Sequence, residues 1–208
     1  MINDWFRGAV SRGLDGPAHW LLRHGVTPDV ITVVGTTGSS VAAVVLFPTG
    51  HLFAGAFIAW GFVMFDLLDG AVARARGTGS RFGGVLDSVC DRISDGAIFG
   101  AAAWWAGSTG HGVLAALALI CLVSGQVISY AKARAEAAGL RADGGLVERA
   151  ERLILGLTGL GLTGLGVPYA VDVALWLLAV GSVVTVAQRV LAVRRSAREL
   201  GDDSATAP

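Results

Sequence analysis

Charged residues are scarce in this chain: of its 208 residues, 15% are charged and 53% are hydrophobic. A soluble domain of this length normally carries about 25% charged residues, so the composition argues against a soluble globular protein. The apolar residues, which give a mean hydropathy of +0.63, gather in runs long enough to cross a bilayer. The sequence therefore predicts an all-α integral membrane protein with a single membrane domain.

Cysteine and lysine are rarer still. Cys90 and Cys121 are the only cysteines, and both fall in apolar runs, where two buried free side chains are favoured over a disulfide or a metal pair. Lys132 is the only lysine. The first residues are polar and interrupted by glycines, so we expect no secretory signal.

Six membrane-spanning helices are predicted, over residues 29–48, 51–75, 83–107, 111–135, 149–167 and 169–192. The first 25 residues set tryptophans among arginines, which favours an amphipathic helix at the membrane surface over a plain soluble helix. The GLTGLG repeat of the fifth span is either low in complexity or a set of small residues for close helix packing. The predicted organisation is a juxtamembrane helix over 1–25, a six-helix membrane domain over 26–195 and a polar, disordered tail over 196–208.

The basic residues predict how these spans are oriented. Every lysine and arginine lies in the N-terminal segment or within 74–92, 132–152 or 189–198. The connections on the opposite side, near 48–51, 107–111 and 166–172, carry none. By the positive-inside rule, the basic connections and both termini are cytoplasmic, which requires an even number of spans. We therefore expect a multi-pass protein of the cell membrane.

Four aspartates interrupt the second and third spans, at Asp66, Asp69, Asp87 and Asp91. A carboxylate at bilayer depth costs several kcal/mol, so four of them call for a metal ion or a water-filled functional cavity. The first pair shares one helix face with Gly70 and Ala73, and the second pair is spaced i, i+4 on the next helix. Two facing pairs of carboxylates favour a hard cation such as Mg²⁺, near the cytoplasmic ends of both helices.

Two other interpretations of these aspartates stay open on spacing alone. They could pair with nearby arginines in an ion network at the membrane edge, with candidates at Arg74, Arg76, Arg81 and Arg92. They could also form the ion site of a membrane cation transporter. A transporter favours acids near the membrane midplane and matched halves, whereas these acids lie toward one side and no internal repeat is visible.

The arrangement resembles the signature of the CDP-alcohol phosphotransferases. The match covers eight positions at fixed gaps: Asp66, Asp69, Gly70, Ala73, Arg74, Gly83, Asp87 and Asp91. Further segments, TPDVIT at 27–32, CDRISDGA at 90–97, QVISYAKARAEAAGLRADGG at 126–145 and ERAERL at 148–153, are similar to the actinobacterial phosphatidylinositol phosphate synthases of this family. The resemblance implies a six-span enzyme that transfers the phosphatidyl group of CDP-diacylglycerol to a myo-inositol phosphate and releases CMP.

The resemblance also implies a site with two Mg²⁺ ions, with Mn²⁺ as the alternative metal. Asp66 and Asp87 would bind both ions, Asp69 one and Asp91 the other. Such a pair of ions would neutralise the pyrophosphate and polarise the phosphorus under attack. Asp91 would in addition be the general base that takes the proton of the attacking hydroxyl.

The same resemblance implies that the CDP-lipid binds to small residues and an arginine of the motif. It also implies contacts with the segment 29–32, which lies opposite the motif. The implied residues are Asp29, Val30, Ile31, Thr32, Gly70, Ala73, Arg74 and Ser80. The assignment of Gly70 has a second reason that does not depend on the resemblance: any side chain there would block close approach of the ligand to the helix. Ser80 could also be an ordinary turn residue.

The remaining basic residues bear on the acceptor. Some could be topology signals only, which is the interpretation we prefer for Arg141, Arg194, Arg195 and Arg198. A phosphorylated acceptor needs a cationic pocket beside the metals, and the resemblance implies one on Lys132, Arg152 and Arg189, supported by Arg134 and Arg149.

Three rivals to the inositol phosphate reaction remain. A phosphatidylglycerophosphate synthase of the same family also uses a phosphorylated acceptor, a membrane cation transporter belongs to another class, and a catalytically silent lipid-binding paralogue is disfavoured by the intact set of aspartates. The resemblance implies a homodimer surrounded by membrane lipids, and we expect no nucleic-acid partner.

Overall fold

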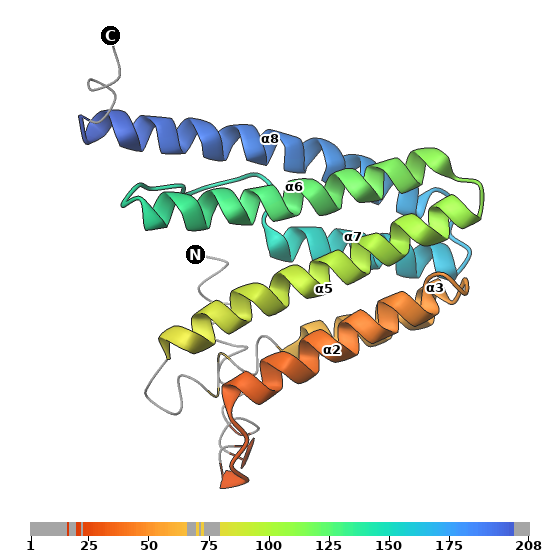
Figure 1. Ribbon diagram of the computed structural model, residues 1–208. Helices are drawn as coiled ribbons and strands as arrows, with labels where there is room; N and C mark the ends of the chain where they lie inside the picture. The colour runs from red at the N-terminus through yellow and green to blue at the C-terminus, as the bar shows by residue number, and fades with distance from the viewer. Residues whose placement is uncertain are drawn as a thin grey trace.

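The computed structural model describes residues 16, 20–21, 23–65, 70, 72 and 80–201 of the chain. Its secondary structure over these residues is helical (Figure 1). The helices are α2 (Pro28–Leu46), α3 (Leu52–Val63), α5 (Arg81–Ser108), α6 (Gly112–Ala137), α7 (Arg149–Gly164) and α8 (Ala170–Glu199). The all-α prediction is confirmed for the described residues, and each predicted span overlaps one of these helices.

The helix ends differ from the predicted spans in two places. Helix α3 ends at Val63 with Met64 in a turn, before the predicted span ends at 75. Helix α8 continues to Glu199, past the predicted start of the tail at 196, because Ser196 is buried and its hydroxyl accepts a hydrogen bond from the Arg141 backbone N–H at 3.0 Å. The predicted helix over 1–25 and the end of the tail lie almost entirely outside the described residues.

The six helices pack as a closed ring. The extensive contacts follow the order α2, α3, α7, α8, α6, α5 and back to α2. Successive helices along the chain run in opposite directions, so the connections near 48–51, 107–111 and 166–170 meet at one end of the bundle (Figure 1). The starts of α5 and α7 and the ends of α6 and α8 meet at the other end, where the basic residues lie.

Local signals fix where the helices at this basic end begin. Thr27 caps α2 by accepting a hydrogen bond from the Val30 N–H, and Ser80 caps α5 by accepting from the Gly83 N–H at 2.7 Å. Glu148 and Glu151 form a reciprocal capping box at the start of α7. The capped ends hold the first turns of α5 and α7 in place, and these turns carry the candidate site residues.

Glycines allow α7 to lie unusually close to two neighbours. A Cβ added at Gly159 would lie 2.5 Å from the Ala174 Cβ of α8, and one added at Gly164 would overlap the backbone of Phe53 in α3. Small residues that permit such close approach are a common feature of packed membrane helices. The structure thus confirms close packing as the role of the glycine-rich fifth span.

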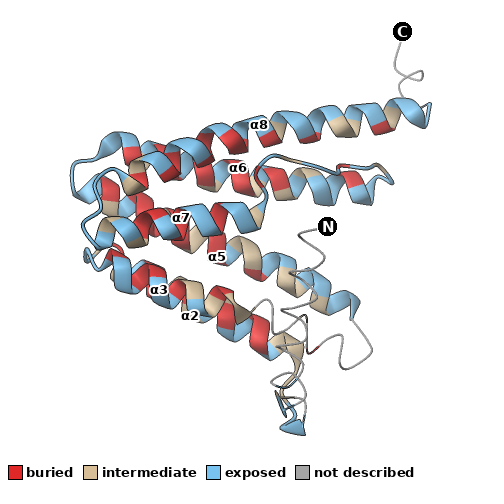
Figure 2. Ribbon diagram, turned by 180° about the vertical axis from the view of Figure 1, so that it is seen from behind, coloured by how far each residue is buried: buried red, intermediate tan, exposed pale blue. Residues whose placement is uncertain are grey.

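Three helices are long and apolar enough to cross a membrane, namely α2, α6 and α8. Helix α5 is of similar length, but two aspartates and two arginines occupy its first half. Buried positions face the neighbouring helices and exposed positions the outside (Figure 2). Large apolar side chains such as Phe57, Trp104 and Trp176 are among the exposed ones. An apolar outer surface of this kind suits a protein surrounded by lipid tails.

Candidate active site

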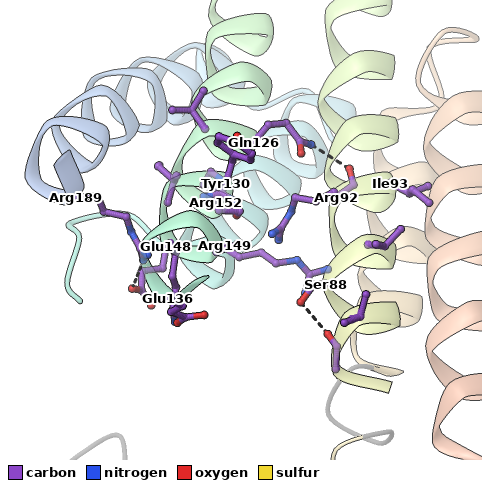
Figure 3. A pocket seen from close by; sticks show the side chains of 18 residues that line it. Ser88, Arg92, Ile93, Gln126, Tyr130, Glu136, Glu148, Arg149, Arg152 and Arg189 are labelled. Carbon is purple, nitrogen blue, oxygen red and sulfur yellow. Dashed lines mark hydrogen bonds and ion pairs between the residues drawn. The ribbon is translucent and has the colours of Figure 1, made fainter. Parts of the chain in front are cut away.

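A cavity of about 1140 Å³ opens at the basic end of the bundle. Its walls come from α5, α6, α7 and α8 (Figure 3). Five cationic side chains line it: Arg92, Lys132, Arg149, Arg152 and Arg189. Two acidic residues, Glu136 and Glu148, also line it, so the lining is positively charged overall. A cavity with this lining suits an anionic ligand.

Two of these arginines are almost fully buried. Arg152 is 1% exposed and Arg189 is 4% exposed. Each binds one carboxylate, Arg152 Nη2 to Asp95 Oδ2 at 2.9 Å and Arg189 Nη2 to Glu148 Oε1 at 3.0 Å. The Nε and Nη1 atoms of both are buried and have no hydrogen-bond partner among the described residues. Because a buried donor without a partner is costly, these atoms favour an anion in the cavity.

One face of α5 carries three aspartates in successive turns, at 87, 91 and 95. Asp91 is partly buried, and its Oδ1 lies 2.8 Å from Arg149 Nη1 of α7. Its Oδ2 lies 3.5 Å from Arg92 Nη2. Arg149 also reaches Asp95 Oδ1, 3.3 Å from its Nε. The structure therefore joins the carboxylate face of α5 directly to the cationic cavity, through Arg149.

This geometry bears on the predicted ion network. Asp91 does form ion pairs, but the closer one is with Arg149 from another helix and not with an arginine of its own segment. An arginine shared between Asp91 and Asp95 orients both carboxylates, as in a charge-assisted hydrogen-bond network. Ion pairing and a functional role are therefore compatible here.

The predicted CDP-lipid residues lie partly together. Asp29 of α2 faces the first turn of α5, since a Cβ added at Gly83 would lie 3.2 Å from Asp29 Oδ1 and 2.9 Å from Ser80 Oγ. Ile31 and Thr32 are buried, and Ile31 packs against Val72, which lies between the motif residues Gly70 and Ala73. Val30 is 51% exposed and points away from this contact.

Two residues of the predicted metal site, Asp66 and Asp69, lie outside the described residues, as do Ala73 and Arg74 of the predicted CDP-lipid site. Among the residues that the structure describes, no group of three or more His, Cys, Asp or Glu side chains could hold a metal ion. Asp87 and Asp91, one turn apart on α5, supply two carboxylates, which is the ligand type that hard divalent cations prefer. The donor chemistry of this pair fits a hard divalent cation, and the other predicted pair, Asp66 and Asp69, lies outside the described residues.

Sequence reasoning missed several residues of the cavity and included one outside it. Arg134 does not line the cavity, whereas Arg92, Gln126 and Glu148 do. Gln126 Nε2 donates to the Arg92 carbonyl at 3.1 Å. Asp95 was also missed, although it continues the four-residue interval of Asp87 and Asp91, and that interval was the available signal.

Comparison with known proteins gives a consistent result. Residues 25–187 match the family profile described as CDP-alcohol phosphatidyltransferase. A phosphatidylinositol phosphate synthase of Mycobacteroides abscessus is 59% identical over 178 residues, which is 85% of this chain and 81% of that protein. One from Streptomyces avermitilis is 47% identical and covers this whole chain and 87% of that protein.

A solved structure shares the fold as well. Mycobacterium tuberculosis phosphatidylinositol phosphate synthase with CDP-DAG bound superposes with a TM-score of 0.85 at 56% identity, covering 89% of this chain and 95% of that one. The same protein in complex with manganese and citrate gives a TM-score of 0.84 at 55% identity, covering 88% and 90% of the two chains.

Proposed function

This chain belongs to the CDP-alcohol phosphatidyltransferase family, and we propose that it transfers the phosphatidyl group of CDP-diacylglycerol to a myo-inositol phosphate, giving phosphatidylinositol phosphate and CMP. Membership of this family makes the chain a transferase and removes the cation transporter as an alternative. The choice of acceptor is supported by the names of the curated relatives, which are phosphatidylinositol phosphate synthases.

The observation that carries the proposal is the cationic cavity beside Asp91. A phosphate monoester carries close to two negative charges at neutral pH and several strong acceptor oxygens. Arg152 and Arg189 offer buried N–H groups without partners in the described part of the chain, and Lys132 and Arg149 line the same cavity. An acceptor without a phosphate would leave these donors unpaired. We leave Arg134 out of this site because it does not line the cavity.

The reaction forms one bond and breaks one. An acceptor hydroxyl oxygen attacks the β-phosphorus of CDP-diacylglycerol, and the bond from that phosphorus to the bridging oxygen breaks, so that its electron pair leaves with CMP. Asp91 accepts the hydroxyl proton, as the resemblance implies for the fourth motif aspartate. Its position between α5 and the acceptor cavity supports this role, because the cavity-lining Arg149 contacts it directly.

Two divalent cations would complete the proposed site, where Asp66, Asp69, Asp87 and Asp91 would hold them and Asp66 and Asp87 would contribute to both. Mg²⁺ is the proposed metal and Mn²⁺ the alternative, which the manganese in a similar structure supports. When bound, the ions supply charge neutralisation for the pyrophosphate and for the departing CMP.

The CDP-lipid is proposed to bind where α2 meets the start of α5. The proximity of Asp29 and Ser80 to Gly83 supports this placement. The proposed site also includes Ile31 and Thr32, which follow Asp29 in α2, and Gly70 of the motif. Ala73 and Arg74 complete the predicted set.

The CDP-lipid substrate enters from the surrounding lipid, and we propose that the basic end of the bundle faces the cytoplasm, as the charge distribution predicts. A homodimer remains a prediction from the resemblance.

A CMP-release assay tests the proposal. Purified protein in vesicles is given CDP-diacylglycerol, Mg²⁺ and either inositol phosphate or glycerol phosphate. We expect CMP release with inositol phosphate and a much lower rate with glycerol phosphate. A preference for glycerol phosphate would instead identify a phosphatidylglycerophosphate synthase, and no release with either acceptor would reject the enzyme assignment.

A further inference from the structure

The two most buried cations of the acceptor cavity are held in the same way. Arg152 and Arg189 each use Nη2 to bind a carboxylate, at 2.9 and 3.0 Å. Each keeps Nε and Nη1 buried and without a partner among the described residues. Both arginines, which come from different helices, line the same cavity (Figure 3). In both, a carboxylate fixes one edge of the planar guanidinium at the wall of that cavity.

The carboxylate that holds Arg152 has no contact with the cavity itself. Asp95 is 3% exposed and is absent from the cavity lining, although Arg149 and Arg152, which both bind it, line the cavity. It belongs to α5, whereas the arginines belong to α7. Burying a charge is costly unless it is paired, so Asp95 and Arg152 depend on each other.

A glycine on a third helix completes the support for Arg152. A Cβ added at Gly125 of α6 would lie 3.0 Å from Arg152 Nε and 3.1 Å from its Cζ. The guanidinium is therefore confined between the backbone of α6 and the carboxylate of α5. A side chain held from two sides loses little conformational freedom when a ligand binds.

The carboxylate that holds Arg189 is fixed by helix capping. Glu148 is the N-cap of α7, its side chain accepts from the backbone N–H of Glu151, and its own backbone N–H donates to the Glu151 side chain at 3.0 Å. The same carboxylate accepts from Arg189 of α8. One residue thus sets both the start of α7, which carries Arg149 and Arg152, and the direction of Arg189.

We infer that Asp95 and Glu148 are positioning residues for the acceptor phosphate: each binds the Nη2 group of one buried arginine and so fixes the position of that guanidinium in the wall of the cavity. The identity of the phosphate carrier rests on the function proposed above. Neither acid touches the reacting atoms. Without Asp95, the Arg152 guanidinium would turn toward another partner. Arg149 and Arg152, which both bind Asp95, would then repel each other. The acids thereby determine how strongly a phosphorylated acceptor binds.

Steady-state kinetics test the inference with Asp95→Asn and Glu148→Gln. We expect the KM for inositol phosphate to rise by about tenfold or more while the KM for CDP-diacylglycerol stays within about twofold of wild type. Glu151→Gln is the matched control, because glutamine is also accepted in a capping box and, in the part of the chain that the structure describes, the arginines pair with Asp95 and Glu148 and not with the Glu151 side chain. An unchanged KM for inositol phosphate in both variants, or an equal rise for both substrates, overturns the inference.

A double-mutant cycle tests whether Asp95 acts through Arg152. If it does, Asp95→Asn combined with Arg152→Gln raises the KM no further than Arg152→Gln alone. If the double variant instead shows a rise in KM equal to the product of the two single rises, Asp95 acts independently of Arg152, which contradicts the inference.

Gly125→Ala provides a variant with unchanged charge, in case the aspartate variant does not fold. We expect the same selective rise in KM, and a wild-type KM would contradict confinement of Arg152.

A binding measurement separates this inference from the proposed function. Inorganic phosphate is titrated into the detergent-solubilised protein while thermal unfolding is followed, so no turnover is needed. Stabilisation of the wild type that is lost in Asp95→Asn and kept in Glu151→Gln supports the inference even if inositol phosphate is not the substrate. Equal stabilisation of the wild type and Asp95→Asn overturns it even if CMP release confirms the enzyme.

Discussion

Three aspartates at intervals of four residues give α5 one acidic face, yet their surroundings differ. Asp87 lies nearest the start of the helix and is partly buried. Asp91 is paired with Arg149 at 2.8 Å, and Asp95 is almost fully buried between two arginines. The Asp95 side chain is only 4% exposed, so its carboxylate is closed to a further ligand, whereas the Asp91 side chain keeps 18% of its surface exposed. Asp87 and Asp91 are therefore the aspartates of this helix suited to a metal, and Asp95 is suited to support.

The first prediction concerns Asp87. Asp87→Asn keeps the shape of the side chain but removes the charge that we propose is shared by two metal ions, so we expect kcat to fall by about a hundredfold or more. The CMP-release assay measures the rate, and thermal unfolding in detergent checks that the fold persists. Asp172→Asn, the same change at the opposite end of the bundle, should leave the rate unchanged. Near-normal turnover of Asp87→Asn would contradict the shared-metal assignment.

A second prediction concerns Lys132, the only lysine of the chain. Its side chain is 50% exposed at the cavity, and its nearest acid is Glu136 at 4.0 Å, so the ammonium group is available to a ligand. We expect Lys132→Ala to raise the KM for the phosphorylated acceptor by about tenfold, as for the loss of one charged hydrogen bond. Arg141→Ala, a change at an exposed cation outside the cavity lining, is the control. An equal effect in both variants would indicate a general electrostatic effect.

The sequence predicted Asp87, Asp91 and most of the cations, because spacing and motif resemblance are properties of the chain itself. It could not predict which acid holds which arginine. Asp95 lies 54 and 57 residues before its two arginines, and Glu148 lies 41 residues before Arg189. These pairs exist only once α5, α7 and α8 are packed, and no local pattern encodes that packing.

The helices themselves were easier to predict than their packing. Apolar length predicted where the spans lie, and each predicted span overlaps one described helix, although only α2, α6 and α8 are themselves long and apolar enough to cross a membrane. The order of helices around the ring is set by contacts between segments far apart, such as α3 with α7 and α6 with α8. The end of α8 was missed because its last turn is polar by composition and becomes helical through the contact of Ser196 with Arg141.

Two glycines of α7 make a matched pair for a stability prediction. A Cβ at Gly159 would lie 2.5 Å from the Ala174 Cβ and 3.2 Å from the Ala170 carbonyl oxygen, whereas one at Gly161 would meet only the Ala56 Cβ at an ordinary 3.5 Å. We expect Gly159→Ala to destabilise the protein by about 1–3 kcal/mol through overpacking. Gly161→Ala should be neutral or stabilising by up to about 1 kcal/mol, since alanine favours helix.

Thermal or denaturant unfolding of the two glycine variants in the same detergent gives the comparison. Both changes add one methyl group to the same helix, so differences in helix propensity cancel. Equal stability of the two variants would mean that α7 can move away from α8 without cost. The close approach would then not be what fixes the position of Arg149 and Arg152 at the other end of α7.

The molecule as a whole is polarised along the bundle axis. One end carries the cavity, the capped starts of α5 and α7 and the basic connections, while the other end consists of short turns without lysine or arginine (Figure 1). A soluble phosphorylated acceptor must therefore enter from the basic end. The positive-inside rule predicts that this end faces the cytoplasm, where both substrates and CMP would be handled.

Site-specific labelling in intact cells tests that orientation. Asp143 lies in the exposed basic connection and Thr109 in the turn at the opposite end, and the native Cys90 and Cys121 are buried at 6% and 0% exposure. A membrane-impermeant maleimide should label Thr109→Cys in intact cells and Asp143→Cys only after permeabilisation, with little labelling of the native cysteines. Both variants should retain CMP release, which shows that the labelled protein is correctly folded. The reverse labelling pattern would place the cavity outside the cell and contradict the proposed direction of acceptor entry.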